Sequence, residues 1–167
     1  MEIWDGYYKD GTLAGVDLYR GKPIPEGLYH IVCEILVQHT DGDYLLMQRA
    51  WTKPAYAGYF ESSAGGSALK GETPVMCAKR ELLEETGISS SKLEQIGHSI
   101  FSNTIYFSYL CTTDCLKDSI VLQENETIGY KWVSKKEFIE FVNSYEIIET
   151  QKKRYTEYFK KMGFLLN

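Results

Sequence analysis

Short apolar runs separated by turn residues fill the first part of the chain and predict β-strands. Residues 2–19 predict a hairpin that turns at residues 9–11 (Lys-Asp-Gly), and the proline- and glycine-containing residues 20–27 predict a loop. Further apolar runs predict three strands, at residues 30–38, 44–49 and 59–64. We expect the last of these strands to lead into a loop that contains Gly65 and Gly66.

One amphipathic helix is predicted to follow this loop. Thr73 is suited to be its N-cap, Pro74 to be its first residue and Gly87 to end it. On a helix, residues three and four apart share a face, so three glutamates form one stripe, namely Glu81, Glu84 and Glu85. We expect the opposite side to pack on the core through Val75, Met76, Ala78, Leu82 and Leu83.

The second half of the chain predicts more strands and then helices. Strands are expected at residues 93–99, 100–112 and 130–133, with an acidic loop at residues 123–129. Ser134 is expected to cap a helix that runs to residue 144, and residues 149–162 predict another helix.

Strands separated by single helices indicate an α+β or an α/β fold, of which we expect α+β. No repeat or compositional break divides the chain, so we expect residues 1–167 to form a single domain. In this domain, residues 1–28 would form an N-terminal hairpin and loop, and residues 135–167 the C-terminal helices.

Composition narrows the range of functions. The formal net charge of -5 argues against a nucleic-acid partner, which would favour a basic surface. The sequence has no apolar run of about 18 residues and no secretory leader, so we expect no membrane partner and a cytoplasmic location. The four cysteines are then expected to be reduced packing residues (Cys33, Cys77, Cys111 and Cys115).

The three neighbouring glutamates are the main chemical signal. Like charges at this spacing destabilise a helix, and a solvated acidic face is the simplest interpretation of the stripe taken alone. Carboxylate oxygens are, however, the ligands that Mg²⁺ prefers. Gly65 and Gly66 would let the backbone approach such an ion, and Glu72 stands where the loop enters the helix. This context favours a Mg²⁺ site that holds a diphosphate.

The spacing of these residues resembles a known family signature. Gly66 is followed after five residues by Glu72, and after seven more by the run Arg-Glu-Leu-Leu-Glu-Glu-Thr-Gly-Ile at residues 80–88. This pattern resembles the Nudix box, with every defined position filled. The resemblance implies an α/β/α sandwich around a mixed β-sheet. It also implies hydrolysis of a nucleoside diphosphate linked to another moiety X, with Mg²⁺ or Mn²⁺ as cofactor.

Roles for individual residues follow from the same resemblance. It implies that Glu81, Glu84, Glu85 and the Gly65 carbonyl bind the metal, and that Glu72 and Arg80 support these ligands. Many members of the family add an acidic residue from a late loop, for which Glu126 is our first candidate and Glu124 our second. The catalytic set is then Glu81, Glu84, Glu85 and Glu126, and the resemblance leaves the general base open among Glu81, Glu84 and Glu126.

The substrate is expected to be a small nucleotide or diphosphate. Arg49 and Lys53 could bind its phosphates. Aromatic side chains could stack on a ring of the substrate, or simply pack in the sheet, namely Trp51, Tyr56, Tyr59 and Phe60. Arg20 and Lys22 could reach over from the N-terminal loop. The sequence leaves open the X group, the number of metal ions and a homodimer.

A looser resemblance points to the Nudix subgroup related to isopentenyl-diphosphate isomerase. It rests on residues 2–5, 20–23, 29–30 and 47–61. An isomerase needs a cysteine just before the box, where this chain has Ser-Ser-Ala-Gly-Gly at 62–66, and a histidine where it has Ser67. Only His30 fits the histidines of its metal site. Because no box glutamate is missing, we prefer the hydrolase both to the isomerase and to a non-catalytic binding module.

Overall fold

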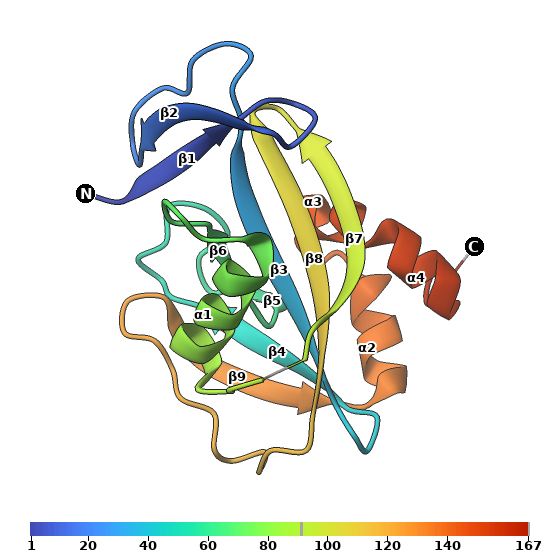
Figure 1. The fold of residues 1–167 in the computed structure, drawn as a ribbon. Coiled ribbons are helices and arrows are strands. Elements are labelled where there is room, and N and C mark those ends of the chain that lie inside the picture. The colour runs from blue at the N-terminus through green and yellow to red at the C-terminus, as the bar shows by residue number, and fades with distance from the viewer. Residues whose placement is uncertain (91, 167) are drawn as a thin grey trace.

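The computed structural model describes residues 1–90 and 92–166, in which a small hairpin stands beside a larger mixed sheet (Figure 1). The hairpin pairs β1 (Ile3–Tyr7) with β2 (Leu13–Tyr19) in antiparallel orientation, as predicted. The strands of the larger sheet are β3 (His30–His39), β4 (Tyr44–Arg49), β5 (Phe60–Ser62), β6 (Ala64–Ser67), β7 (Glu94–Phe101), β8 (Thr104–Thr113) and β9 (Thr127–Val133). The helices are α1 (Pro74–Thr86), α2 (Lys135–Val142), α3 (Glu149–Arg154) and α4 (Thr156–Met162).

Two neighbouring strands of this sheet separate after their hairpin. β3 and β4 pair only at Gln38 and Tyr44, beside the turn. Beyond this pair, β6 lies against β3 and β5 lies against β4. Ser63, between β5 and β6, holds the branch point, because its hydroxyl donates to the Leu45 carbonyl and accepts from the Val37 N–H, each at 2.9 Å. The separation opens space inside the sheet where the candidate site lies.

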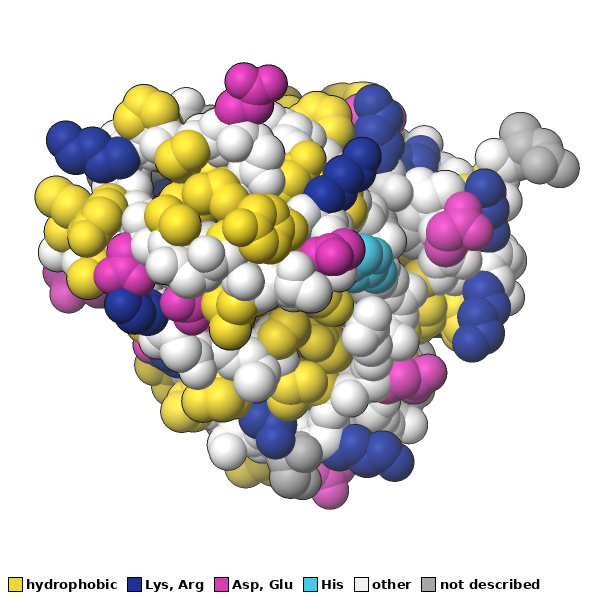
Figure 2. Space-filling model, turned by 45° about the horizontal axis from the view of Figure 1, so that its top comes forward, with side chains coloured by type: hydrophobic (Ala, Val, Ile, Leu, Met, Phe, Trp, Pro, Cys, Tyr) yellow, Lys and Arg dark blue, Asp and Glu magenta, His cyan; other side chains and the backbone are white. Residues whose placement is uncertain are grey.

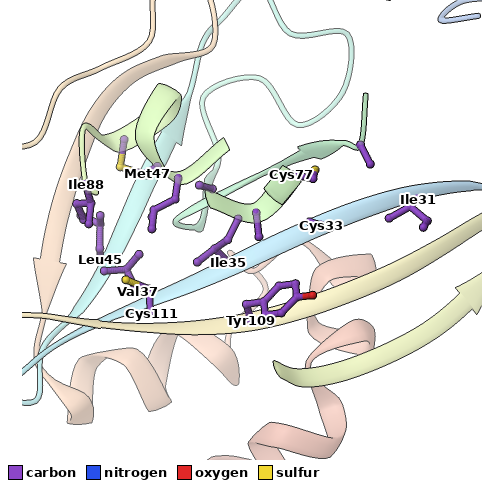
Figure 3. Packing of buried hydrophobic residues seen from close by; sticks show 14 of the residues in the cluster. Ile31, Cys33, Ile35, Val37, Leu45, Met47, Cys77, Ile88, Tyr109 and Cys111 are labelled. Carbon is purple, nitrogen blue, oxygen red and sulfur yellow. The ribbon is translucent and has the colours of Figure 1, made fainter. Parts of the chain in front are cut away.

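The sheet is covered on both sides. In Figure 1, α1 lies on one face, and α2, α3 and α4 lie on the other. Alternate residues of β3 divide between these layers. Cys33, Ile35 and Val37 pack with α1 (Figure 3), whereas Leu36 joins the aromatic cluster of the C-terminal helices. This arrangement confirms the predicted α/β/α sandwich around a mixed β-sheet, within an α+β fold.

Helix α1 begins and ends where the sequence predicts. The Thr73 hydroxyl accepts from the Met76 N–H at 3.2 Å, and Gly87, with a φ of 75°, donates its N–H to the Leu83 carbonyl at 2.9 Å. The predicted core face was wrong in part, because Val75, Met76 and Leu83 are exposed. Ala78 and Leu82 are buried together with Glu81 and Glu85, so the helix turns these two glutamates toward the sheet, whereas Glu84 of the stripe is exposed.

Four predicted boundaries were wrong. The strand predicted at 59–64 divides at Ser63, and Gly65 and Gly66 lie in β6 rather than in a loop. β7 and β8 meet at a turn where Ser102 has a φ of 54°, after the predicted boundary. β9 starts at Thr127, inside the predicted acidic loop. The last predicted helix divides at Tyr155, a buried side chain in the aromatic cluster.

The N-terminal hairpin is attached to the loop that precedes α1. The Lys70 N–H donates to the Ile3 carbonyl at 2.8 Å, the Gly71 N–H donates to Asp5 Oδ2 at 2.7 Å, and Lys70 Nζ pairs with Asp17 at 2.6 Å. These contacts place the hairpin beside the residues of the glutamate motif.

The surface and the cysteines complete the description. Acidic and basic side chains are interspersed with apolar ones on the face drawn in Figure 2. Within the described ranges, no helix is both long and apolar enough to cross a membrane. The four cysteines are free thiols, of which Cys33, Cys77 and Cys111 are buried, as expected of packing residues, and Cys115 is half-buried.

Candidate active site

A cavity with two lobes opens beside Gly65 and Gly66. The glutamate lobe, of about 500 Å³, is lined by Glu81, Glu84 and Arg80 of α1 and by residues of the N-terminal hairpin. The α3 lobe, of about 270 Å³, extends between the separated strands toward helix α3. Five residues are shared by the linings of the two lobes, namely Lys53, Gly65, Gly66, Glu85 and Glu126. A ligand could therefore pass from one lobe to the other across the two glycines.

The two glycines leave room for their neighbours, α1 in the case of Gly66 and β3 in the case of Gly65. A Cβ on Gly66 would come within 2.3 Å of Glu81 Oε1 and 2.4 Å of its Cδ, far closer than real contacts allow. A Cβ on Gly65 would come within 2.7 Å of the Cys33 carbonyl oxygen. Gly66 thus lets the Glu81 carboxylate lie directly against the strand.

Arg80 organises the carboxylates at the start of the motif. It binds Glu72 through Nε at 2.7 Å and through Nη2 at 2.9 Å, and Glu72 also accepts from the Leu69 N–H at 2.8 Å. The same guanidinium donates from Nη1 to Glu81 at 2.6 Å and to Glu84 at 3.2 Å. The Arg80 guanidinium keeps the pKa of Glu72 below its usual value. Glu72 is thus occupied in fixing Arg80 and the loop.

The buried glutamates are held at an electrostatic cost. Burial raises the pKa of Glu81, an effect that the neighbouring Arg80 partly opposes. Burial raises the pKa of Glu85 well above its ordinary value, and the charges of Glu61, Glu81 and Glu126 raise it further. Among the described residues, no Lys or Arg forms an ion pair with Glu85. A cation in the shared part of the cavity would relieve this repulsion.

The donor set fits a divalent cation in its chemistry. It offers carboxylate oxygens and a glycine-lined strand that leaves room for them, as Mg²⁺ requires. In the side-chain conformations of residues 1–90 and 92–166, no three His, Cys, Asp or Glu residues converge closely enough to enclose an ion. Arg80 engages Glu81 and Glu84, and Lys53 engages Glu126, so a bound ion would compete with these basic side chains for the carboxylate oxygens that it uses.

The predicted phosphate-binding residues divide between two roles. Lys53 lines both lobes and contacts Glu126. Arg49 lines the α3 lobe, where its guanidinium is held by Glu61 at 3.0 Å and by the Ala55 carbonyl at 3.1 Å.

The two candidate glutamates of the late loop differ in position. Glu126 lines both lobes, whereas Glu124 lines neither and is exposed.

The predicted aromatic residues do not gather at the glutamates. Tyr59 and Phe60 line a separate groove with Phe141 and Tyr145. Trp51 is 71% exposed and covers Gly58, where a Cβ would come within 2.2 Å of the indole. Tyr56 alone of this set lines the α3 lobe. Of the basic residues suggested in the N-terminal loop, Arg20 lines the glutamate lobe and pairs with Glu2 at 2.8 Å.

Sequence reasoning missed most of the α3 lobe. Glu34 of β3 and Arg154 of α3 form a buried ion pair on its wall, with a distance of 2.8 Å from Arg154 Nε to Glu34 Oε2. Glu61 and Gln151 also line this lobe. The one available signal was Glu34, a charged residue inside the apolar run His-Ile-Val-Cys-Glu-Ile-Leu-Val-Gln. A buried charge of this kind needs a partner.

Comparisons with known proteins agree with this geometry. The model of the NUDIX domain family matches residues 28–157. The uncharacterized Nudix hydrolase lmo0368 of Listeria monocytogenes is 31% identical over 152 residues, 89% of each chain. The isopentenyl-diphosphate Delta-isomerase of Corynebacterium diphtheriae is 29% identical over 126 residues, 69% of each chain.

Solved structures share the fold at low sequence identity. DR0079 from Deinococcus radiodurans aligns with a TM-score of 0.73 at 16% identity, covering 92% of this chain and 99% of that one. The NUDIX domain of Shewanella oneidensis NrtR, determined as a complex with ADP ribose, aligns with a TM-score of 0.64 at 13% identity, covering 86% and 94%. With the matched family model and the complete glutamate motif, the chain belongs to the NUDIX domain family and is a hydrolase.

Proposed function

We propose that this protein hydrolyses the diphosphate linkage of a nucleoside diphosphate joined to another moiety X, by Mg²⁺-dependent attack of water on phosphorus, with Mn²⁺ as a substitute. The observation that carries the proposal is Glu85. Its carboxylate is buried between two lobes of one cavity, other carboxylates raise its pKa, and no Lys or Arg of the described residues forms an ion pair with it. Such an arrangement suits a site that a divalent ion completes.

Each residue of the site has a distinct proposed role. Glu81, Glu84, Glu85 and the Gly65 carbonyl would hold the ion. When bound, a divalent ion neutralises charge on phosphate oxygens and lowers the pKa of a coordinated water. Arg80, fixed by Glu72, positions Glu81. One of Glu81, Glu84 and Glu126 accepts the proton of the attacking water, and Glu126 is the candidate that comes from outside the helix.

The basic residues divide the work of holding the substrate. Lys53 stands where the two lobes meet and is our candidate for the phosphate contact. We assign Arg49 to the wall of the α3 lobe, because Glu61 and the Ala55 carbonyl already occupy its guanidinium. Tyr59 and Phe60 have no part in this proposal, since they line another groove.

Isomerisation of an isoprenoid diphosphate is the second candidate, favoured by the similarity to the Corynebacterium isomerase. The residues of the site support it less well than hydrolysis. Ser63, just before the motif, is bonded to the Leu45 carbonyl and the Val37 N–H. None of His30, His39 and His98 lines either lobe. His30 instead stacks on Trp4 with the ring centres 4.6 Å apart.

The test is phosphate or nucleotide release from sugar nucleotides, dinucleotides and nucleoside di- and triphosphates with Mg²⁺, with isopentenyl diphosphate run alongside for isomerisation. We expect turnover of one nucleotide class that stops on chelation and returns with Mg²⁺ or Mn²⁺. Turnover of isopentenyl diphosphate alone would favour the isomerase. Nucleotide binding without turnover of any compound would favour a binding module.

A further inference from the structure

We propose that the α3 lobe binds the X group through Gln151 and Arg154, and that this group carries hydrogen-bond acceptors rather than a hydrocarbon chain. The inference rests on the proposed function and names the class of its substrate. Gln151 and Arg154 are three apart in α3, and both line the α3 lobe, which adjoins Glu85, Gly65 and Gly66. Neither residue belongs to the glutamate motif.

Gln151 presents a fixed donor to the cavity. It is only 6% exposed, and its carboxamide oxygen accepts from the Ser62 N–H at 3.1 Å. Because a backbone N–H can only donate, this bond assigns the oxygen and leaves the amide Nε2 on the other side. Nε2 has no hydrogen-bond partner among the described residues. It is also absent from the buried unpartnered atoms, so it reaches solvent, and since Gln151 lines the α3 lobe, Nε2 faces this lobe.

Arg154 presents a second donor from the same wall. Its Nε and Nη2 donate to the two oxygens of Glu34, and its guanidinium lies 4.5 Å from the centre of the Tyr106 ring. These contacts fix the plane of the guanidinium and leave Nη1 without a partner among the described residues. A guanidinium held in this way can donate two hydrogen bonds from Nη1 to a ligand.

The remaining wall disfavours an apolar group. Val32, Ala64 and Ile148 line part of the α3 lobe, but charged side chains line more of it, namely Glu34, Glu61, Glu85, Glu126, Arg49, Lys53 and Arg154. A hydrocarbon chain here would displace water from these groups and return no hydrogen bond, which a polar site penalises strongly. A nucleobase or a sugar offers carbonyl or hydroxyl oxygens to Gln151 and Arg154. The lobe therefore selects polar X groups.

The test compares Gln151→Glu with the wild type on ADP, ADP-ribose, UDP-glucose and geranyl diphosphate. The variant keeps an oxygen for the Ser62 N–H and replaces the Nε2 donor by a carboxylate oxygen. For the nucleotide that the wild type uses, we expect KM to rise about tenfold or more while kcat changes less than about twofold. Geranyl diphosphate should be the poorest substrate of the wild type, and its KM should not rise in the variant.

Lys153→Ala is the matched control, because Lys153 is exposed on the same helix and lines neither lobe. It should keep the wild-type KM. Gln151→Met, which adds no charge, replaces the Glu variant if thermal unfolding shows that the latter does not fold. An effect on ADP-ribose or UDP-glucose without one on ADP, which has no X group, would support the inference. An equal effect on ADP would place the acceptor on the nucleoside and overturn the assignment of the lobe to the X group.

An unchanged KM for every nucleotide, or an equal rise for geranyl diphosphate, would overturn the inference. A wild type that hydrolyses neither these compounds nor any other nucleotide of the panel described above would refute the proposed function instead. In that case, calorimetric titration of ADP, ADP-ribose and UDP-glucose into the wild type and the Gln151→Glu variant tests whether the α3 lobe binds a polar X group. Binding of ADP-ribose or UDP-glucose that the variant weakens about tenfold, without such an effect on ADP, would support it, and binding of none, or equal binding to both proteins, would overturn it.

Discussion

Glu85 shows at the scale of one residue how function and stability oppose each other. Its carboxylate is 7% exposed, and its pKa is raised by burial and by Glu61, Glu81 and Glu126. An uncompensated charge in such a place destabilises the folded chain unless a cation joins it. We therefore attribute this residue to the proposed metal site rather than to packing.

Glu85→Gln should abolish turnover and leave the fold intact. We expect kcat with Mg²⁺ to fall at least about a hundredfold. The free energy of unfolding of the metal-free protein should be unchanged or higher, because one of several mutually repelling charges is removed. Urea denaturation and phosphate release measure the two effects. Glu84→Gln should lose activity in the same way, whereas Glu124→Gln, at an exposed position outside the lobes, should not. Full activity of both Glu85→Gln and Glu84→Gln would refute the assignment of these residues to the metal site.

Gly66→Ala tests the closeness of α1 to β6. The added Cβ would collide with the Glu81 carboxylate, so either the carboxylate or the strand must move. We expect weaker Mg²⁺ binding by calorimetry and a loss of about 1–3 kcal/mol in the free energy of unfolding. Ser67→Ala, on the same strand and without a side-chain hydrogen bond among the described residues, should change neither quantity much. Equal effects of the two substitutions would mean that the strand adapts.

The branch between β3 and β4 is the feature at the scale of elements that creates room for the site. The residue at this branch is Ser63, which is buried, has a φ of 36° and forms hydrogen bonds to both strands through its hydroxyl. The two short strands β5 and β6 continue the pairing of β4 and β3 on either side of this residue.

Ser63→Ala should destabilise the protein by about 1–3 kcal/mol, because it leaves the Val37 N–H and the Leu45 carbonyl buried without this partner. Ser62→Ala is a close control. Ser62 is also buried, but its hydroxyl bridges no backbone groups of β3 and β4, so its removal should cost less. Urea denaturation of both variants separates the two cases. Equal destabilisation would show that burial of a hydroxyl, and not the bridge, is what matters at this branch.

The elements could be predicted from sequence where their signals are local. Thr73, Pro74 and Gly87 defined α1, and the turn residues defined the first hairpin. The division at Ser63 could not be predicted, because it depends on which strands β5 and β6 meet across the sheet. The exposure of Val75, Met76 and Leu83 was missed for a similar reason, since the close approach of Glu81 to Gly66 decides how α1 is rotated.

At the scale of the whole molecule, the site combines one contiguous motif with residues spread over the chain. The motif made the glutamates and Arg80 predictable. The α3 lobe is built from residues as distant as Glu34, Tyr106 and Arg154, whose meeting depends on the parallel pairing of β3 with β8 and on the position of α3. Periodicity and spacing do not encode such meetings, so this wall of the candidate site had to be found in the structure.

The attachment of the N-terminal hairpin to the sheet should make the stability of the whole molecule depend on pH. His30, at the start of β3, stacks on Trp4 of β1, and burial lowers the pKa of its imidazole. A histidine with a lowered pKa in the folded state binds fewer protons there than in the unfolded chain, where its pKa is about 6.5. Above about pH 6.5, His30 is neutral in both states and costs the folded protein no stability. As the pH falls through 6.5 toward the folded-state pKa, the unfolded chain takes up the proton first, and the free energy of unfolding decreases.

His30→Gln should reduce the loss of unfolding free energy between pH 7.5 and pH 5.5, measured by urea denaturation at each pH, relative to the wild type. His98→Gln, a change at an exposed position on β7, should leave the wild-type dependence in place. Burial opposes the imidazolium, whereas stacking on an indole can favour a cation by about 0.5–2 kcal/mol. If the wild type and the His30 variant lose equal stability, then the stacking on Trp4 offsets burial, and the hairpin would stay attached in mildly acidic solution.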